Sequence, residues 1–118
     1  MKMNNNIKNK SIWEEVYKIC SQIPEGFISN YKEISNKLNI SPRVVGQALK
    51  NNPYDSSLVP CHRVISSTYF IGGFRGQWGK GEKVSEKIDK LSKEGIIFNE
   101  KGFVIKEIRE KVLFNKFT

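Results

Sequence analysis

The chain has 118 residues, of which 20 are Lys or Arg and 12 are Asp or Glu, giving a net charge of +8. This length fits a single domain that buries its own apolar core without disulfides or metal. The charge predicts an acidic partner, with nucleic acid as the first candidate, although a basic surface that binds nothing has the same composition.

Cysteine and histidine are too few for a usual zinc site. The chain has only Cys20, Cys61 and His62, and the two cysteines form no CxxC pair. No apolar run approaches the roughly 20 residues that cross a bilayer, and the polar N-terminus lacks the apolar segment of a secretion signal. We therefore expect free thiols, no metal, no cofactor, and a cytoplasmic location, or a nuclear one in a eukaryote.

We expect one domain over residues 11–105, with a further segment at each end of the chain. Residues 1–10 are rich in Asn and Lys and predict a flexible lead. A helix is expected from Ser11, as its N-cap, to about Gln22, with Cys20 on its apolar side as a core residue. Residues 106–118 predict a tail that is helical and loosely docked.

Two short helices joined by a tight turn are predicted next. Asn30 is a good N-cap for a helix over 31–38, with Glu33 placed to complete a capping box. Ser41 is an N-cap for a second helix over 42–51, and Pro42 suits its first position. The pair is typical of a helix-turn-helix.

The second helix of this pair has two different faces. Its inner face is apolar, and the opposite face carries a polar stripe at i, i+4 and i+7. The inner residues are Val45, Ala48 and Leu49, and the outer ones are Arg43, Gln47 and Lys50.

The second half of the chain predicts one more helix and a hairpin. Residues 68–81 are rich in glycine and aromatic residues and suggest flexible backbone near a site. A helix over 82–93 packs Val84, Ile88 and Leu91 inward, and we expect its Lys83, Lys87 and Lys90 on a solvated surface. Residues 96–105 predict a hairpin that serves as a wing beside the helix-turn-helix. The fold class is thus mostly α with small β, a winged-helix-like helix-turn-helix domain.

The most reactive candidate is Cys61, which adjoins His62 and lies just before Arg63. A thiolate is the nucleophilic form of cysteine, and a nearby base or positive charge favours it. Because adjacent side chains diverge, His62 is expected to reach the sulfur through a water. A half-buried cysteine beside a surface histidine is the alternative without chemistry.

Glu94 contradicts a local rule. A carboxylate in the last turn of a helix faces the negative end of the helix dipole, at a cost of ~0.3–1 kcal/mol. A role in orienting and charging His62 would explain the position. A solvated glutamate at a frayed helix end is the alternative.

Taken in order, these residues resemble the O6-alkylguanine-DNA alkyltransferase family over roughly residues 11–98. The hallmark Pro-Cys-His-Arg-Val-(Val/Ile) stands at Pro60–Ile65, and Arg-x-Val-Gly-x-Ala at Arg43–Ala48. The other matching motifs are Ser29-Asn30-Tyr31, Asn52-Pro53, Gly72-Gly73-Phe74 and Glu94-Gly95.

The resemblance implies DNA repair by single-turnover transfer of an alkyl group from guanine O6 to Cys61, after the base is flipped out from the minor groove. The implied catalytic residues are Cys61, His62 as the water-linked base, Glu94 as its orienter, and Asn52 as a brace of the active-site turn. The implied DNA-binding residues are Tyr31, Arg43 as the inserted finger, Gly46, Gln47 and Lys50. The implied substrate pocket comprises Pro60, Val64, Gly72, Gly73 and Phe74.

Three departures from the family pattern stand out. These 118 residues do not include the N-terminal domain common in the family, nor the zinc ligands that some members carry. Phe74 stands where many members have a tyrosine hydroxyl. Val44 and Gln47 are bulkier than the residues that often line the groove face.

The resemblance therefore predicts a monomeric, single-turnover (suicide) methylated-DNA–protein-cysteine methyltransferase acting on duplex DNA that carries O6-alkylguanine. The alternative is a non-catalytic winged-helix DNA-binding protein, either a lesion sensor or a regulator. A cysteine hydrolase fits poorly, since no oxyanion-hole signature accompanies Cys61.

Overall fold

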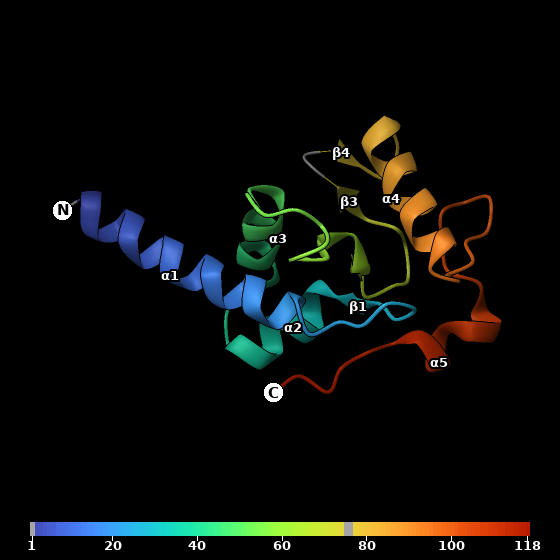
Figure 1. Ribbon diagram of the computed structural model, residues 1–118, viewed down its shortest axis with the longest axis horizontal. Coiled ribbons are helices and arrows are strands. Elements are labelled where there is room, and N and C mark those ends of the chain that lie inside the picture. The colour runs from blue at the N-terminus through green and yellow to red at the C-terminus, as the bar shows by residue number, and fades with distance from the viewer. Residues whose placement is uncertain (1, 75–76) are drawn as a thin grey trace.

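The computed structural model describes residues 2–74 and 77–118 and shows a mostly helical chain with two very small sheets (Figure 1). The described elements are α1 (Lys2–Cys20), β1 (Ser29–Asn30), α2 (Tyr31–Leu38), α3 (Pro42–Lys50), the 3-10 turn η1 (Cys61–Arg63), β2 (Val64–Ile65), β3 (Gly73–Phe74), β4 (Gln77–Trp78), α4 (Glu82–Lys93), the 3-10 turn η2 (Lys106–Ile108) and α5 (Arg109–Val112). Within these ranges no helix combines the length and apolarity needed to cross a membrane.

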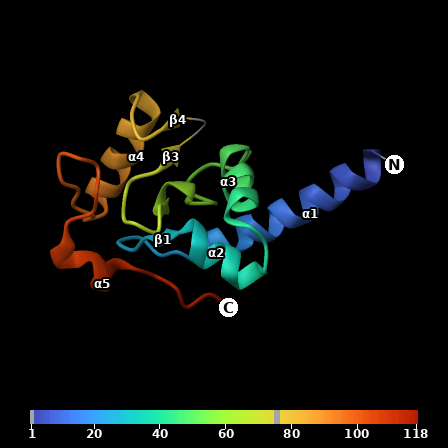
Figure 2. The ribbon, with the colours of Figure 1, turned by 180° about the vertical axis from the view of Figure 1, so that it is seen from behind.

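The first helix is longer than predicted. Its N-terminal part projects from the rest of the molecule in both ribbon views (Figures 1 and 2). α1 begins at Lys2, so the predicted start at Ser11 is wrong, and residues 2–10 of the expected flexible lead continue the helix. No glycine or proline interrupts residues 2–20, and nothing local stops the helix from extending back past Ser11.

The C-terminal half of α1 supplies one wall of the main core. Val16 and Cys20 are fully buried, as the helical spacing predicts. The Tyr17 hydroxyl donates a hydrogen bond of 2.7 Å to the carbonyl of Ala48, which ties α1 to α3. The buried members of this core are Val16, Tyr17, Ile19, Cys20, Ile23, Ile34, Val45, Ala48, Leu49, Val59, Cys61, Val64 and Phe74.

Side-chain caps fix the helix-turn-helix. Asn30 Oδ1 accepts a 2.8 Å hydrogen bond from the Glu33 N–H, and Ser41 Oγ accepts one of 3.2 Å from the Val44 N–H. Asn39 ends α2 in the left-handed conformation at φ 56°, a turn that asparagine tolerates well. The predicted caps and the bounds of α2 are confirmed, and α3 ends one residue before the prediction.

A two-residue parallel pairing joins the helix-turn-helix to the segment after η1. Ser29 pairs with Val64 and Asn30 with Ile65. Asn30 therefore has two roles, because it pairs with β2 and also caps α2. This arrangement places the start of α2 beside the end of the Cys-His-Arg turn.

The predicted hairpin over 96–105 forms, but not as a wing of the helix-turn-helix. Phe98 pairs with Val104, and Phe103 pairs with Phe70. The orange segment between α4 and η2 lies on the opposite side of the molecule from α3 (Figure 1). Its apolar residues are drawn into a second core, whose buried members are Ile28, Ile65, Ile71, Val84, Leu91, Ile96 and Val104. The hairpin that faces α3 is instead β3–β4, in which Gly73 pairs with Trp78.

The C-terminal tail docks along Ile28. The Ile28 N–H donates to the Val112 carbonyl at 2.8 Å, and the Phe114 N–H donates to the Ile28 carbonyl at 2.7 Å. Phe114 and Phe117 pack against the main core. The tail is thus only briefly helical, in η2 and α5, and then extended against the domain.

Lys87 contradicts the sequence prediction most strongly. α4 has the predicted bounds, but the side chain of Lys87 is fully buried at 0% exposure instead of solvated. Its ammonium donates hydrogen bonds of 2.7, 2.8 and 2.8 Å to the carbonyls of Val64, Ile71 and Gly73. All three donors of the ammonium are therefore used, which offsets part of the cost of burying the charge.

Replacing Lys87 by Met should destabilise the fold. The change leaves three inward-facing carbonyls without their donor, so the free energy of unfolding should fall by about 3 kcal/mol or more. Lys83→Met, on an exposed position of the same helix, is the matched control and should change stability by less than about 0.5 kcal/mol. Urea unfolding measures both, and a Lys87→Met protein as stable as the wild type would contradict this account.

Lys87 should also make the stability of the fold depend on pH. Burial lowers the pKa of Lys87 to about 7, below its value in the unfolded chain. Between about pH 7 and 9 the unfolded chain therefore binds more protons at this position, and its contribution to stability rises with pH. The stability difference between the wild type and Lys87→Met should widen over this range, and a difference independent of pH would argue against the assignment.

Candidate active site

A cavity of about 470 Å³ opens between α3 and the β3–β4 hairpin. That volume lies in the range of small-molecule pockets in proteins. The cavity is lined by Tyr31, Pro42, Arg43, Gly46, Gln47, Leu49, Lys50, Cys61, Gly73, Phe74, Gln77 and Trp78. The helix-turn-helix and the Cys-His-Arg segment thus meet at one place.

Cys61 is the only cysteine on this cavity among the described residues. It begins η1, directly after Pro60, and is 8% exposed. Its N–H donates a 2.7 Å hydrogen bond to the Val59 carbonyl, which holds the turn tight. Cys20, by contrast, is fully buried in the core, and burial raises the pKa of its thiol. The two thiols therefore differ in access, and only the sulfur of Cys61 can meet a ligand.

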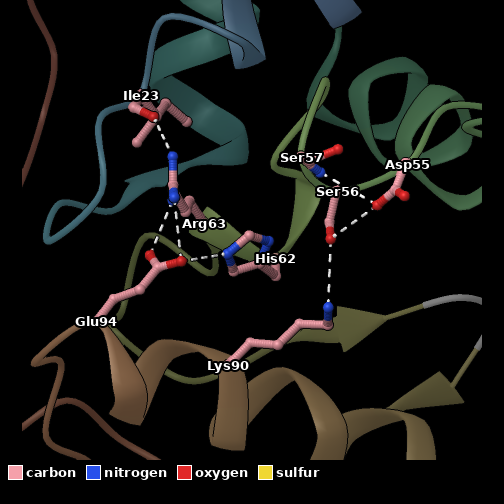
Figure 3. A network of polar contacts seen from close by, with 8 residues as sticks. All are labelled: Ile23, Asp55, Ser56, Ser57, His62, Arg63, Lys90 and Glu94. Atoms are coloured by element: carbon pink, nitrogen blue, oxygen red, sulfur yellow. Dashed lines mark hydrogen bonds and ion pairs between the residues drawn. The ribbon is translucent and has the colours of Figure 1, made fainter.

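His62 and Glu94 are in direct contact, as Figure 3 shows. His62 Nε2 lies 2.9 Å from Glu94 Oε2. An ionised carboxylate only accepts hydrogen bonds, so Nε2 carries the proton and Nδ1 keeps its lone pair. Nδ1 is buried and has no hydrogen-bond partner within the described part of the chain. The imidazole is therefore oriented with a free acceptor, as a base requires.

Arg63 completes the same network, a partner that the sequence prediction missed. Its Nε and Nη2 donate to Glu94 at 2.8 and 3.0 Å, and its Nη1 donates to the Ile23 carbonyl at 2.8 Å (Figure 3). This two-pronged contact is the geometry that guanidinium and carboxylate favour. The cation compensates the unfavourable position of Glu94 at the C-terminus of α4 and links it to the turn that follows α1. The only sequence signal was its place in the hallmark motif.

The environment sets the protonation of this pair. Burial lowers the pKa of His62, and the hydrogen bond to Glu94 opposes that shift only in part. Burial raises the pKa of Glu94, but the hydrogen bonds from Arg63 and His62 outweigh it, and the net pKa lies below the usual value. At neutral pH the pair is thus a neutral imidazole and an ionised carboxylate. Glu94 thus contacts His62, and its orienting role stays a prediction, whereas the lowered pKa of His62 argues against the expectation that Glu94 keeps the ring charged.

The loop between α3 and η1 is held from two sides. Asn52 Oδ1 accepts a 2.9 Å hydrogen bond from the Tyr54 N–H, so it braces the start of this loop. At the other end Lys90 Nζ donates to Ser56 Oγ at 3.2 Å and joins the loop to α4 (Figure 3). Asn52 therefore acts on the turn just after α3, and the described contacts do not connect its side chain directly with Cys61.

The predicted DNA-binding residues gather on one side of the cavity. Arg43, Gln47 and Lys50 are exposed on α3, and with Gly46 they line the cavity. Tyr31 enters from the start of α2. Burial raises the pKa of Tyr31 to about 12, although a hydrogen bond with the Gly73 backbone opposes the rise, so the hydroxyl stays protonated.

The predicted substrate-pocket residues divide into two groups. Gly73 and buried Phe74 line the cavity, whereas Pro60, Val64 and Gly72 are buried and are not among its lining residues. Val64 serves instead as a strand residue of β2 and an acceptor for Lys87. Trp78 lines the cavity although the sequence analysis gave it no role.

Comparisons with known proteins agree with this arrangement. The family model described as "6-O-methylguanine DNA methyltransferase, DNA binding domain" matches residues 11–96. A methylated-DNA–protein-cysteine methyltransferase of Archaeoglobus fulgidus is 38% identical over 90 residues, which cover 76% of this chain and 60% of the relative. One of Saccharolobus solfataricus is 41% identical over 71 residues, covering 60% of this chain and 46% of the relative. The chain thus matches 60% or less of the length of these two curated relatives.

Solved structures show the same fold. The O6-methylguanine-DNA methyltransferase of Pyrococcus kodakaraensis matches 72% of this chain and 46% of its own, with a TM-score of 0.61 and 34% identity. Atl1 of S. pombe, solved with damaged DNA containing O6-carboxymethylguanine, matches 89% of this chain and 95% of its own, with a TM-score of 0.68 and 28% identity. Both the sequence match and the fold therefore lead to one conclusion: the chain belongs to the 6-O-methylguanine DNA methyltransferase family.

Proposed function

We propose that this protein repairs duplex DNA by moving an alkyl group from O6 of guanine to the sulfur of Cys61, once per molecule. The observation that carries the proposal is the position of Cys61 on a cavity bordered by the helix-turn-helix, with the oriented His62–Glu94 pair beside it. Proteins that act on a base inside a duplex must extrude it into such a cavity.

The proposed reaction is a single displacement. The Cys61 proton passes through a bridging water to Nδ1 of His62, the acceptor that the Glu94 contact leaves free. The thiolate attacks the alkyl carbon as the carbon–O6 bond breaks, and the bonding electron pair leaves with the guanine. The imidazolium proton then returns through solvent to the released base. A thioether does not leave readily, so the sulfur keeps the alkyl group.

The exposed face of α3 is proposed to bind the DNA. Arg43 stands at the cavity and would fill the space in the stack that the extruded base leaves. Tyr31 is proposed to favour rotation of the lesion by crowding the neighbouring phosphate. Gln47 and Lys50 would contact the backbone, which predicts affinity that falls steeply with salt. We further propose residues 11–105 as the functional unit and a monomer as the acting form.

Lesion binding without transfer is the second candidate. The observation in its favour is the extensive match to S. pombe Atl1, which was solved on damaged DNA. Alkyltransferase-like proteins replace the reactive cysteine, whereas Cys61 is present here and reaches the cavity. That difference favours transfer.

Intact-mass measurement distinguishes the two candidates. With methylated duplex DNA, the protein should gain the mass of one methylene unit per chain, located on Cys61. Cys61→Ala should gain nothing, and Cys20→Ala is the matched control that should still react, since Cys20 is buried away from the cavity. Tight binding of the lesion with no gain of mass would support the sensor instead.

Arg43→Ala should separate base extrusion from chemistry. The variant should slow transfer from methylated duplex DNA at least tenfold, but react with free O6-benzylguanine within about twofold of the wild type, because a free base needs no extrusion. Lys93→Ala, an exposed cation on α4, is the control for charge alone. Equal slowing in both reactions would refute the finger role.

Glu94→Gln should shift the pH profile of transfer. His62 acts as a base only when neutral, so the wild-type rate should fall as the pH drops through its lowered pKa, below about 6.5. Glu94 raises the pKa of His62, so the variant should move this acid limb to lower pH while its plateau rate falls, because the base is weaker. Asp89→Asn on exposed α4 surface is the control. A profile that keeps both limb and plateau would remove Glu94 from the mechanism.

A further inference from the structure

Trp78 is an exposed aromatic side chain at the edge of the Cys61 cavity. It is 63% exposed, and it is the largest of the exposed apolar residues in the described part of the chain. Leaving an indole in water forgoes hydrophobic stabilisation, and aromatic side chains are prominent in the lining of ligand cavities, where Trp78 lies.

The indole is held in position from beneath. A Cβ added at Gly73 would lie 2.8 Å from Trp78 Cε3, so the ring sits where only glycine leaves room. A Cβ added at Gly72, where φ is 76°, would lie 3.5 Å from Trp78 Cη2 at the far end of the same ring. The Tyr31 ring adds a tilted contact, with centroids 6.3 Å apart. The indole thus packs against the backbone of Gly72 and Gly73.

The backbone around Trp78 is fixed as well. Trp78 pairs with Gly73 across the hairpin, and the Gly79 N–H donates a 2.9 Å hydrogen bond to the Gly72 carbonyl. Gly73 is in turn held by Lys87. Because the ring is already positioned, a ligand that stacks on it loses less conformational entropy on binding.

The reaction geometry identifies which part of the substrate can reach this ring. In a single displacement the sulfur and the leaving oxygen lie on opposite sides of the alkyl carbon. The alkyl group therefore faces Cys61, which is 8% exposed, and the purine extends away from it toward the open side of the cavity. Trp78 lines the same cavity and is 63% exposed against 8% for Cys61, which puts the indole nearer the open side, so its natural contact is the purine and not the alkyl group.

We propose that Trp78 is a specificity-determining residue whose indole stacks on the purine of the extruded alkylguanine. This inference rests on the proposed function. Every nucleobase has a π face, and stacking on an aromatic side chain contributes to binding without reading sequence. Trp78 would thereby replace part of the stacking that the base loses on leaving the duplex.

Single-turnover kinetics with O6-benzylguanine test the proposal. Trp78→Ala should raise the half-saturating concentration about 5- to 150-fold, the range that base–aromatic stacking supplies. The limiting rate constant should change far less, and Trp78→Phe should restore most of the binding. Ile97→Ala, which removes an exposed apolar side chain that does not line the cavity, is the matched control. An unchanged half-saturating concentration in Trp78→Ala would overturn the assignment.

Iodoacetamide separates stacking from damage to the site. This reagent alkylates the Cys61 sulfur but has no ring to stack, so its rate in Trp78→Ala should stay within about twofold of that of the wild type. An equal loss with iodoacetamide and with O6-benzylguanine would mean that Trp78 merely supports the cavity, and would overturn the specificity role.

Direct binding distinguishes failure of this inference from failure of the proposed function. In a Trp13→Phe, Cys61→Ser protein, Trp78 is the only tryptophan and the sulfur is gone. O6-methylguanine should quench its fluorescence saturably, while benzyl alcohol, which has no purine, should not. Quenching by a protein whose wild type transfers nothing would sustain the stacking inference and refute only the transferase. Absence of quenching would refute the stacking inference itself.

Discussion

One buried ammonium holds the site together. Lys87 donates to carbonyls on β2, on the segment before β3 and on β3 itself. β2 continues directly from the Cys-His-Arg turn, Ile71 lies just before the β3–β4 hairpin, and Gly73 of β3 lines the cavity. A short loop and two-residue strands have too few ladder hydrogen bonds to fix one another, and the fully satisfied cation supplies the missing cross-links.

The charge of Glu94 in the site is likewise compensated by a cation. Glu94 ends α4 at the unfavourable end of the helix dipole, and Arg63 compensates it with two hydrogen bonds. Once compensated, the carboxylate orients His62, whose buried ring stays neutral. The adjacent residues of η1 thereby separate their tasks. Cys61 lines the cavity, the His62 ring is held by the Glu94 carboxylate, and Arg63 stabilises that carboxylate.

Local signals predicted local structure well. The caps at Asn30 and Ser41 and the bounds of α4 depend on neighbouring residues, and each appears as the pattern indicates. The unusual position of Glu94 correctly suggested a contact with His62. Lys87 was misplaced because its partners are 14 to 23 residues away in sequence, although it shares the apolar stripe with Val84 and Leu91. Which hairpin faces α3 is likewise decided by packing that no local pattern records.

The C-terminal tail covers one edge of the extended backbone around Ile28. Ile28 and β1 form a short extended run whose backbone is shared between β2 and the segment around Leu113. An extended run with open hydrogen-bonding groups is a template on which another polypeptide can add a strand. The C-terminal segment occupies that edge from within the same molecule. We therefore expect a chain whose tail detaches to expose this edge and to be prone to strand exchange with its neighbours.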